Sequence, residues 1–263
     1  MAAPSQVLAP RSTARFRPPR FGLGGSHLAN AEDATAMATV DAAYQAGIRF
    51  FDTSPEYGAS ERRLGTALQR RPRGEFLVST KVSGADPEES VRASSERLGL
   101  AVDLVFAQDE AAYPVLDRLR RDGVIKAVGA VADDWRELDE LVRDVELDCV
   151  LLSQYGLLDQ SAKPLLDRCV ARAVSVIVSG VLTPQVLQVQ TVEARRISAV
   201  CERYGVSLPQ AALAFPSRHS AVTSVLIAAS SPAEIRADAA LVRQPVPERL
   251  WKDPELLGLL SSN

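Results

Sequence analysis

The sequence predicts a (β/α)8 barrel, and three observations support this fold class. Eight short apolar runs, rich in β-branched residues, recur along the chain. Helix-like stretches separate them, and from the second run to the sixth a new run begins about every 25 residues, the length of a compact βα unit. No linker divides the 263 residues. Near-continuous apolar runs of this length are typical of strands buried on both faces of a parallel sheet.

The apolar runs are the expected strands, and the stretches between them include the expected helices. The strands are expected at residues 20–25, 48–52, 75–81, 102–108, 125–131, 147–154, 174–179 and 222–228. The helices are expected at residues 31–47, 86–99, 113–123, 134–144, 161–172, 191–205 and 231–242. Their ends carry ordinary signals: Gly47 and Gly99 are good stops, while Asp86 is a good N-cap with Pro87 in the first turn.

A doubly wound open sheet is the alternative architecture. Such a sheet usually has a GxGxxG turn after its first strand, at the start of a helix. The stretch GLGGSHLAN at residues 22–30 is rich in glycine but lacks that spacing. The barrel is therefore the favoured prediction.

Composition limits the classes of partner. Hydrophobic residues make up 46% of the chain, charged residues 24%, and the net charge is -3. A basic surface for nucleic acid is not expected, and no apolar run approaches the ~20 residues that span a bilayer. We expect one domain at residues 21–263 after a flexible tail at 1–20. The tail has four arginines and no acid, as transit peptides do, but it lacks the apolar core of a secretory signal.

Cysteine and histidine usage indicates the compartment and argues against a metal site. Cys149, Cys169 and Cys201 lie in apolar stretches and never as a close pair, which disfavours a zinc site and a disulfide framework. A reducing compartment is expected, and we predict a cytoplasmic protein. His27 and His219 lie far apart in the sequence, so no metal site is expected.

Polar side chains end three consecutive expected strands. Asp52, Lys81 and Gln108 are the last residues of the second, third and fourth runs, and Tyr57 lies in the loop after the second. The chemistry of a (β/α)8 barrel lies at the carboxyl ends of its strands. We therefore expect these four side chains to meet at one place as catalytic residues.

This combination of groups suits acid–base chemistry. A free phenol has a pKa of about 10 and is a poor acid at neutral pH. An ammonium next to a phenol favours the phenolate, and a carboxylate next to the ammonium holds it in position. Asp52, Lys81 and Tyr57 together are thus expected to make a tyrosine that donates and accepts protons, and the amide of Gln108 is expected to orient a carbonyl.

Further residues near the expected strand ends are candidates for ligand contacts. Asp109 follows the fourth run, Trp135 follows the fifth, and Gln154 and Tyr155 follow or end the sixth. We expect these four to line a substrate pocket. A helix cap with a packed aromatic residue is an equally good interpretation of Trp135.

The chain resembles the aldo-keto reductases, most closely their bacterial aldose and sugar dehydrogenase branch. The resemblance rests on GIRFFDTSPEYGASERRLGTAL, the following STK, RLGLAVDLVFAQD and GVIKAVG, and on two later stretches, LDCVLL and ALAFPSRHSAVTSVLIAASSPAEI. It implies a (β/α)8 barrel with catalytic residues at Asp52, Tyr57 and Lys81. Where that family has a fourth catalytic residue, a histidine, this chain has Gln108.

The resemblance also implies where a nicotinamide cofactor would bind. Gly22 and Gly24 would let the backbone approach it, Ser179 would lie near the nicotinamide, and Glu234 would lie near the adenine. The family usually has a glycine, a basic residue and an asparagine where this chain has Ala228, Ser230 and Asp238. Its long loop after the seventh strand is also shortened here. From these differences we expect no bound cofactor, with NAD(P)H as the alternative.

The expected function follows from this contrast between retained acid–base groups and an altered cofactor site. We expect an enzyme that uses the Tyr57, Lys81 and Asp52 trio on a small carbonyl compound in redox-neutral chemistry, such as dehydration, isomerisation or cyclisation. An NAD(P)H-dependent reductase or sugar dehydrogenase is the alternative. A non-catalytic protein that keeps the fold is the second alternative.

Overall fold

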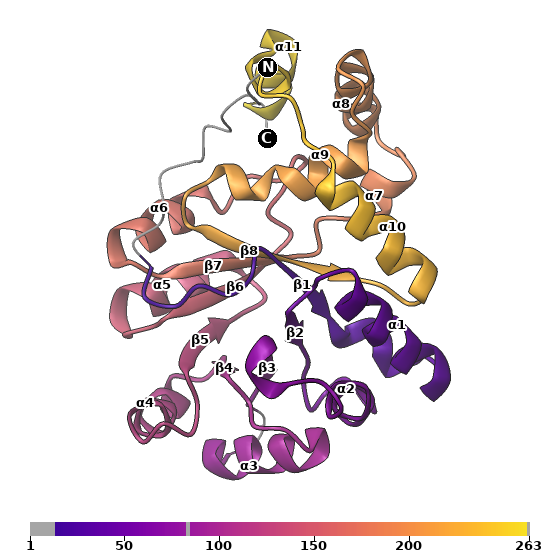
Figure 1. Ribbon diagram of the computed structural model, residues 1–263. Helices are drawn as coiled ribbons and strands as arrows, with labels where there is room; N and C mark the ends of the chain where they lie inside the picture. The colour runs from indigo at the N-terminus through magenta and orange to yellow at the C-terminus, as the bar shows by residue number, and fades with distance from the viewer. Residues whose placement is uncertain (1–13, 83–84, 262–263) are drawn as a thin grey trace, which may run out of the picture.

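The computed structural model describes residues 14–82 and 85–261, and it confirms the predicted barrel. Eight parallel strands pair in chain order and close on themselves, with β1 paired to both β2 and β8 (Figure 1). The strands are β1 Phe21–Gly24, β2 Phe50–Asp52, β3 Leu77–Lys81, β4 Leu104–Ala107, β5 Ala127–Val131, β6 Cys149–Ser153, β7 Ser175–Ser179 and β8 Val222–Ala228. Each lies within or at the edge of the range expected from the apolar runs.

Helices surround the sheet, as βα units of this length require (Figure 1). They are α1 Asp33–Gln45, α2 Ser60–Leu68, α3 Pro87–Leu98, α4 Tyr113–Arg121, α5 Trp135–Asp144, α6 Lys163–Arg172, α7 Pro184–Leu187, α8 Val192–Arg203, α9 Leu208–Ala214, α10 Pro232–Arg243 and α11 Pro254–Leu260. The end signals behave as expected at α3, where Asp86 accepts from the N–H of Glu89 and Gly99 adopts a left-handed conformation. The α2, α7, α9 and α11 helices have no counterpart among the expected ranges.

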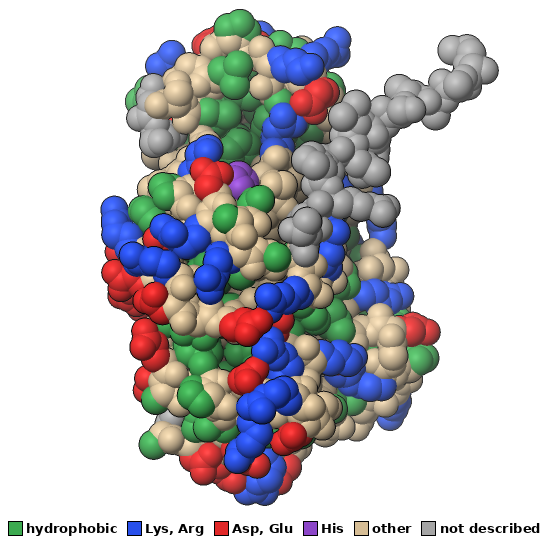
Figure 2. All heavy atoms as spheres, turned by 90° about the vertical axis from the view of Figure 1, so that its left-hand side faces the viewer, with side chains coloured by type: hydrophobic (Ala, Val, Ile, Leu, Met, Phe, Trp, Pro, Cys, Tyr) green, Lys and Arg blue, Asp and Glu red, His purple; other side chains and the backbone are tan. Residues whose placement is uncertain are grey.

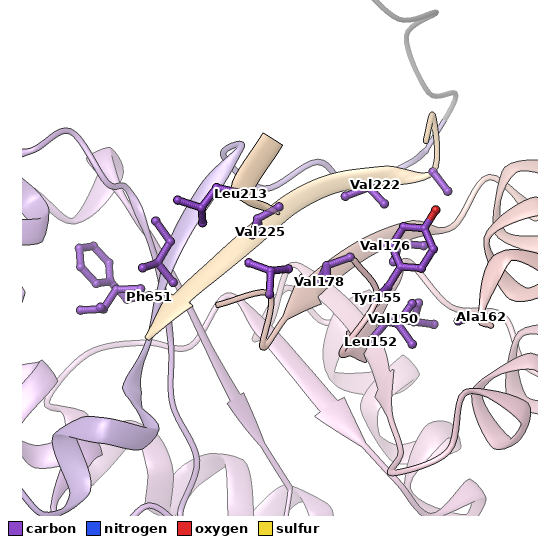
Figure 3. Packing of buried hydrophobic residues seen from close by; sticks show 14 of the residues in the cluster. Phe51, Val150, Leu152, Tyr155, Ala162, Val176, Val178, Leu213, Val222 and Val225 are labelled. Carbon is purple, nitrogen blue, oxygen red and sulfur yellow. The ribbon is translucent and has the colours of Figure 1, made fainter. Parts of the chain in front are cut away.

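Side chains alternate between two cores. Phe50 and Phe106 point into the barrel with Leu226, whereas Phe51 packs outside the sheet, against the helices. This outer core continues around the barrel, from Phe51 on β2 to Val150 on β6, Val176 on β7 and Val225 on β8 (Figure 3). Because successive strand residues face opposite sides, Asp52 points into the barrel as Phe50 does. The same alternation turns Lys81 and Gln108 inward.

The chain before β1 closes the amino-terminal end of the barrel. The side chain of Phe16 packs against the interior core, and the hydroxyl of Ser175 at the start of β7 donates to the Phe16 carbonyl. Ala14 is buried as well. Residues 14–20, part of the expected flexible tail, thus contact the barrel, while residues 1–13 lie outside the described residues.

Two buried aspartates join neighbouring strands at the same end of the barrel. Asp103, before β4, accepts at 2.8 Å from the backbone N–H of Val78 in β3. Asp148, before β6, accepts at 2.8 Å from Val128 in β5 and at 2.7 Å from the Arg120 guanidinium. The repeat of one arrangement in two βα pairs indicates a structural role at this end, opposite the mouth.

The outer surface is charged and mixed in sign. Figure 2 shows lysine and arginine side chains interspersed with aspartate and glutamate over one face of the helical layer. Within the described part of the chain, no helix combines the length and apolarity that crossing a membrane requires.

Candidate active site

The centre of the site is an ion pair at the carboxyl ends of β2 and β3. The ammonium of Lys81 donates to both carboxylate oxygens of Asp52, at 2.9 and 3.1 Å, and to the Thr53 carbonyl at 2.9 Å. The Ser79 hydroxyl donates to the same carboxylate at 2.7 Å. Asp52 is only 3% exposed. A buried carboxylate needs such partners to remain charged, so these hydrogen bonds fix both side chains.

Tyr57 lies over this ion pair, in the short loop between β2 and α2. The centroid of its ring is 4.9 Å from the Lys81 ammonium. The loop is held by hydrogen bonds from the N–H of Tyr57 to Ser54 and from the N–H of Ser60 to Tyr57, and Gly58 supplies the left-handed turn between them. Lys81 therefore faces the ring of Tyr57, whereas its hydrogen bonds go to Asp52 and Thr53.

Gln108 and Asp109 both follow β4, but their side chains lie in different surroundings. Gln108 is exposed and lines the cavity described below, together with Tyr57 and Lys81. Asp109 turns away from it and caps the short helix η3, Glu110–Ala112, by accepting from the N–H of Ala111 at 2.9 Å. The structure thus places Gln108 in the wall of the same cavity as the ion pair and gives Asp109 a local capping contact.

A cavity of about 650 Å³ opens at this end of the barrel. We call it the mouth cavity. Its first part is formed by Asp52, Glu56, Tyr57, Lys81 and Gln108, at the ends of β2, β3 and β4. The volume lies within the range of roughly 300–1,000 Å³ that is usual for sites of small molecules and cofactors.

A second part of the mouth cavity extends over β7, β8 and the start of α10. We call it the α10 arm; its lining comprises residues 179–182, Leu187, Ala228, Ser230, Glu234 and Asp238. Ser179 and Glu234, both expected near a cofactor, therefore lie in one cavity with Tyr57 and Lys81. The arm extends the cavity from the ends of β2, β3 and β4 to the start of α10.

The start of α10 carries two carboxylates into this arm. Glu234 accepts from both the N–H and the hydroxyl of Ser230, each at 2.7 Å, and these bonds hold its pKa below the ordinary value. Asp238, one turn later on the same face, is partly buried. Burial first, and then the neighbouring Glu234, raise the pKa of Asp238 to about 6.

Three of the residues expected in a substrate pocket line a separate, smaller hollow of about 280 Å³. Trp135, Gln154 and Tyr155 contribute to this β5–β6 hollow, which shares Ala132, Asp133 and Ser153 with the mouth cavity. Tyr155 is 5% exposed and packs among Val150 and other apolar residues (Figure 3), so burial raises its pKa to about 12. Trp135 begins α5 behind the capping residue Asp134, as the helix-cap interpretation predicts.

The two glycines of β1 differ in position. Gly24 lines the mouth cavity. Gly22 is buried lower in the barrel, where an added Cβ would lie 2.6 Å from Leu226 and 2.7 Å from Phe50. Packing of large side chains in the barrel interior explains Gly22.

The sequence patterns did not identify several residues that line the mouth cavity, and three of them lie close to the ends of β1 and β2. Ser26 and His27, in the short helix η1 Gly25–Ala29 after β1, line the mouth cavity, as does Glu56 in the loop after β2. The position of η1 directly after a strand end was the available signal, because every such loop of a barrel faces the mouth. Among the described residues, no group of three His, Cys, Asp or Glu side chains is arranged to hold a metal ion.

Comparison with known proteins identifies the family to which the chain is similar. The Aldo/keto reductase family model matches residues 20–253. A D-threo-aldose 1-dehydrogenase of a Pseudomonas species is 31% identical, over 89% of this chain and 92% of the relative. An NADH-specific methylglyoxal reductase of Escherichia coli is 26% identical over 77% of this chain and 81% of the relative. The holo form of an aldo-keto reductase from Bacillus halodurans has the same fold, with a TM-score of 0.81, 20% identity and coverage of 95% and 94% of the two chains.

These relatives overturn two expectations from the sequence. The relatives are named as dehydrogenases and reductases, and one name specifies NADH. The expectation of redox-neutral, cofactor-independent chemistry is therefore wrong. It gave the changed side chains at Ala228, Ser230 and Asp238 too much weight, because a cavity can hold a dinucleotide through its shape and backbone as well as through charged contacts.

Proposed function

The chain belongs to the aldo/keto reductase family, and from this premise we propose that it is a nicotinamide-dependent oxidoreductase. It interconverts a carbonyl group and an alcohol on a small polar molecule. The observation that carries the proposal is the Lys81–Asp52 ion pair beneath the ring of Tyr57, at the wall of a cavity that continues into the α10 arm. The cavity thus joins acid–base groups to a groove for a longer ligand.

The chain's own residues account for the proton transfer. Tyr57 donates a proton to the carbonyl oxygen in reduction and accepts it in oxidation. Lys81 provides positive charge next to the phenol, and Asp52 holds the ammonium in place through two hydrogen bonds. The amide of Gln108 donates a hydrogen bond to the substrate oxygen and orients it.

The residues of the α10 arm fit a nicotinamide dinucleotide. When bound, the dinucleotide supplies or receives the hydride. The small residues Gly24, Gly180 and Ala228 leave the backbone open at the ends of β1, β7 and β8. Apolar side chains, Leu182 and Leu187 among them, also line the arm. The arm is therefore able to hold an extended ligand by surface contact.

We infer a small polar substrate, with aldoses and short aldehydes as the first candidates. The rim around Tyr57 carries Glu56, Gln108, Asp133 and Ser153, which hydrogen-bond hydroxyl groups. Relatives named for D-threo-aldose and methylglyoxal support this class. A long apolar substrate would leave these polar groups without partners.

The test is a coupled measurement of nicotinamide absorbance with a panel of aldoses, pyridoxal, methylglyoxal and glyoxal. We expect NAD+ reduction with at least one aldose or NADH oxidation with at least one aldehyde. Tyr57→Phe should abolish most of this turnover, while the melting temperature should stay unchanged. Absence of turnover with the whole panel, together with absence of nucleotide binding, would contradict the proposal.

A further inference from the structure

Carboxylates dominate the charge in the wall of the mouth cavity. Among the described residues, five carboxylates line it, against one lysine and one histidine; the five are Asp52, Glu56, Asp133, Glu234 and Asp238. The lysine, Lys81, donates two hydrogen bonds to Asp52, so these two opposite charges largely cancel. The other carboxylates give the cavity a negative potential. A cleft lined by charges of one sign concentrates ligands of the opposite sign and repels ligands of its own sign.

Two of these carboxylates lie near the catalytic groups. Glu56 directly precedes Tyr57 in the loop after β2, and Asp133 follows β5. Because β2 and β5 flank β3 and β4 in the barrel, the two carboxylates border the part of the cavity where Lys81 and Gln108 lie. Neither has a hydrogen-bond or ion-pair partner among the described residues. Their negative charge is therefore uncompensated beside the groups that would meet a substrate carbonyl.

The nearest cations are engaged with other carboxylates. In the α10 arm, the hydrogen bonds from Ser230, and to a smaller degree the charge of His27, lower the pKa of Glu234. In the adjoining β5–β6 hollow, the guanidinium of Arg136 lies 3.3 Å from the carboxylate of Asp134. No other lysine, arginine or histidine lines that hollow among the described residues. The catalytic end of the mouth cavity therefore stays negative.

The starts of the nearest helices do not provide a site for an anion either. The helices of a barrel begin at the mouth, where their free backbone N–H groups can bind anionic ligands. Here Asp109 accepts from the N–H of Ala111 at 2.9 Å, at the start of η3, and Asp134 accepts from the N–H of Arg136 at 2.8 Å, at the start of α5. Carboxylates of the chain itself thus occupy these two helix starts.

We propose that Glu56 and Asp133 select the substrate by its charge, so that the enzyme uses neutral and cationic carbonyl compounds and discriminates against carboxylated and phosphorylated ones. The inference rests on the proposed function and specifies its substrate class. Repulsion acts across the cavity, so the selection requires no contact between these carboxylates and the substrate. At a separation of about 7 Å and an effective dielectric constant of about 40, one carboxylate changes the affinity for a singly charged group by about five- to tenfold.

A set of substrates that differ in charge at one position tests the inference. The nicotinamide assay compares the best neutral aldose with the same sugar carrying a carboxylate or an ammonium group on its terminal carbon. If a short aldehyde is the best substrate, the set is glycolaldehyde, glyoxylate and aminoacetaldehyde. At pH 7.5 and low salt, kcat/KM for the neutral compound should exceed that for the carboxylate at least about tenfold, mainly through KM, because repulsion opposes binding. The ammonium compound should be used at least as well as the neutral one.

Two variants and a matched control connect this ratio of neutral to carboxylate substrate to particular side chains. Glu56→Gln and Asp133→Asn keep the shape of the side chain and should each lower the ratio at least about threefold, and the double variant should lower it further. Asp109→Asn removes a carboxylate that caps η3 outside the cavity and should leave the ratio unchanged. Raising the salt concentration should narrow the wild-type ratio, because screening weakens repulsion between like charges. Thermal melts check that each variant is folded.

Four outcomes would overturn the inference. They are a carboxylate substrate used as well as the neutral one, an ammonium substrate used as poorly as the carboxylate, a ratio unchanged in the double variant, and a wild-type ratio insensitive to salt. In these cases the neutral substrate is still turned over, and the proposed function stands. If no neutral compound is turned over and no nucleotide binds, the proposed function fails together with the inference.

Discussion

The ammonium of Lys81 lies 4.9 Å from the centroid of the Tyr57 ring, while its three hydrogen bonds go to Asp52 and Thr53. The positive charge is therefore held under the ring by fixed acceptors. A rigidly positioned charge does not have to reorganise during the reaction, which makes it more effective than a mobile one. The hydroxyl of Tyr57 makes no hydrogen bond to another described residue, and it faces the same cavity as Gln108.

Tyr57→Phe should reduce kcat by about 10²–10⁴-fold, the usual contribution of a positioned acid–base group. The ring and its contact with Lys81 are kept, so folding should be unaffected. Steady-state turnover of the best substrate measures the loss, and thermal melts check the fold. Turnover near the wild-type value would show that the phenol is not the proton donor.

Removing Lys81 alone should destabilise the fold as well as reduce activity. Lys81→Met leaves the buried Asp52 carboxylate without its counter-charge, and breaking a buried pair costs about 3–5 kcal/mol. The double variant Asp52→Asn with Lys81→Met should be more stable than the sum of the two single changes predicts. Denaturant unfolding of the four proteins gives the coupling energy. If the two changes in the free energy of unfolding are additive, the coupling energy is zero and the Asp52–Lys81 pair does not stabilise the fold.

Gln108→Ala should reduce kcat by about tenfold, less than Tyr57→Phe. The amide can donate one neutral hydrogen bond, which is worth about 0.5–1.5 kcal/mol, and it cannot transfer a proton. Asp109→Ala is a matched control, since Asp109 caps η3 outside the cavity. A loss as large as that of Tyr57→Phe would give Gln108 a larger role than orientation.

The barrel could be predicted because its signals are local and repeated. Each strand is a short apolar run, and the turns and caps between them, such as Gly47, Asp86 and Gly99, use ordinary residues. The contacts of Phe16 across the amino-terminal end could not be predicted. Nothing local in residues 14–20 shows that their partner is Ser175, which lies more than half the chain away.

The site residues could be predicted where the alternation of side chains along a strand determines which way they point. Asp52 and Lys81 end β2 and β3, and Gln108 directly follows β4. Each lies two residues after an inward-facing residue, Phe50, Ser79 or Phe106, so the alternation of strand side chains predicts that all three point inward. Glu56 lies in a loop and His27 in the short helix η1; the strand period applies to neither, so the sequence patterns missed both. The cofactor prediction failed for a different reason: residue identity at Ser230 and Asp238 does not reveal the cavity that joins them to Tyr57.

Asp148→Ala should destabilise the fold by about 2–4 kcal/mol. It removes the acceptor for the buried N–H of Val128 and for Arg120, and each buried donor left unpaired costs about 1–3 kcal/mol. Asp117→Ala removes the other partner of Arg120, on the surface of α4, and should cost under 1 kcal/mol. Equal losses for the two variants in urea unfolding would contradict a structural role for the Asp148 link. Activity per folded molecule should stay unchanged in both, because this end of the barrel lies opposite the mouth.

Asp238→Asn should stabilise the fold, and the gain should appear only as the pH rises. Burial and Glu234 raise the pKa of Asp238 to about 6 in the folded chain, above its ordinary value of 3.8. The protonated form is thus favoured in the fold, so the stability it contributes is fully present below about pH 4 and is lost as the pH rises through 6. Asparagine does not ionise, so the melting temperature of the variant should match that of the wild type at pH 4 and exceed it by about 1–3 °C at pH 8.

Glu140→Gln, at an exposed position on α5, is the control and should show no such trend. A difference that is the same at pH 4 and pH 8 would mean that Asp238 ionises in the fold as it does in the unfolded chain, and that the α10 arm does not resist negative charge.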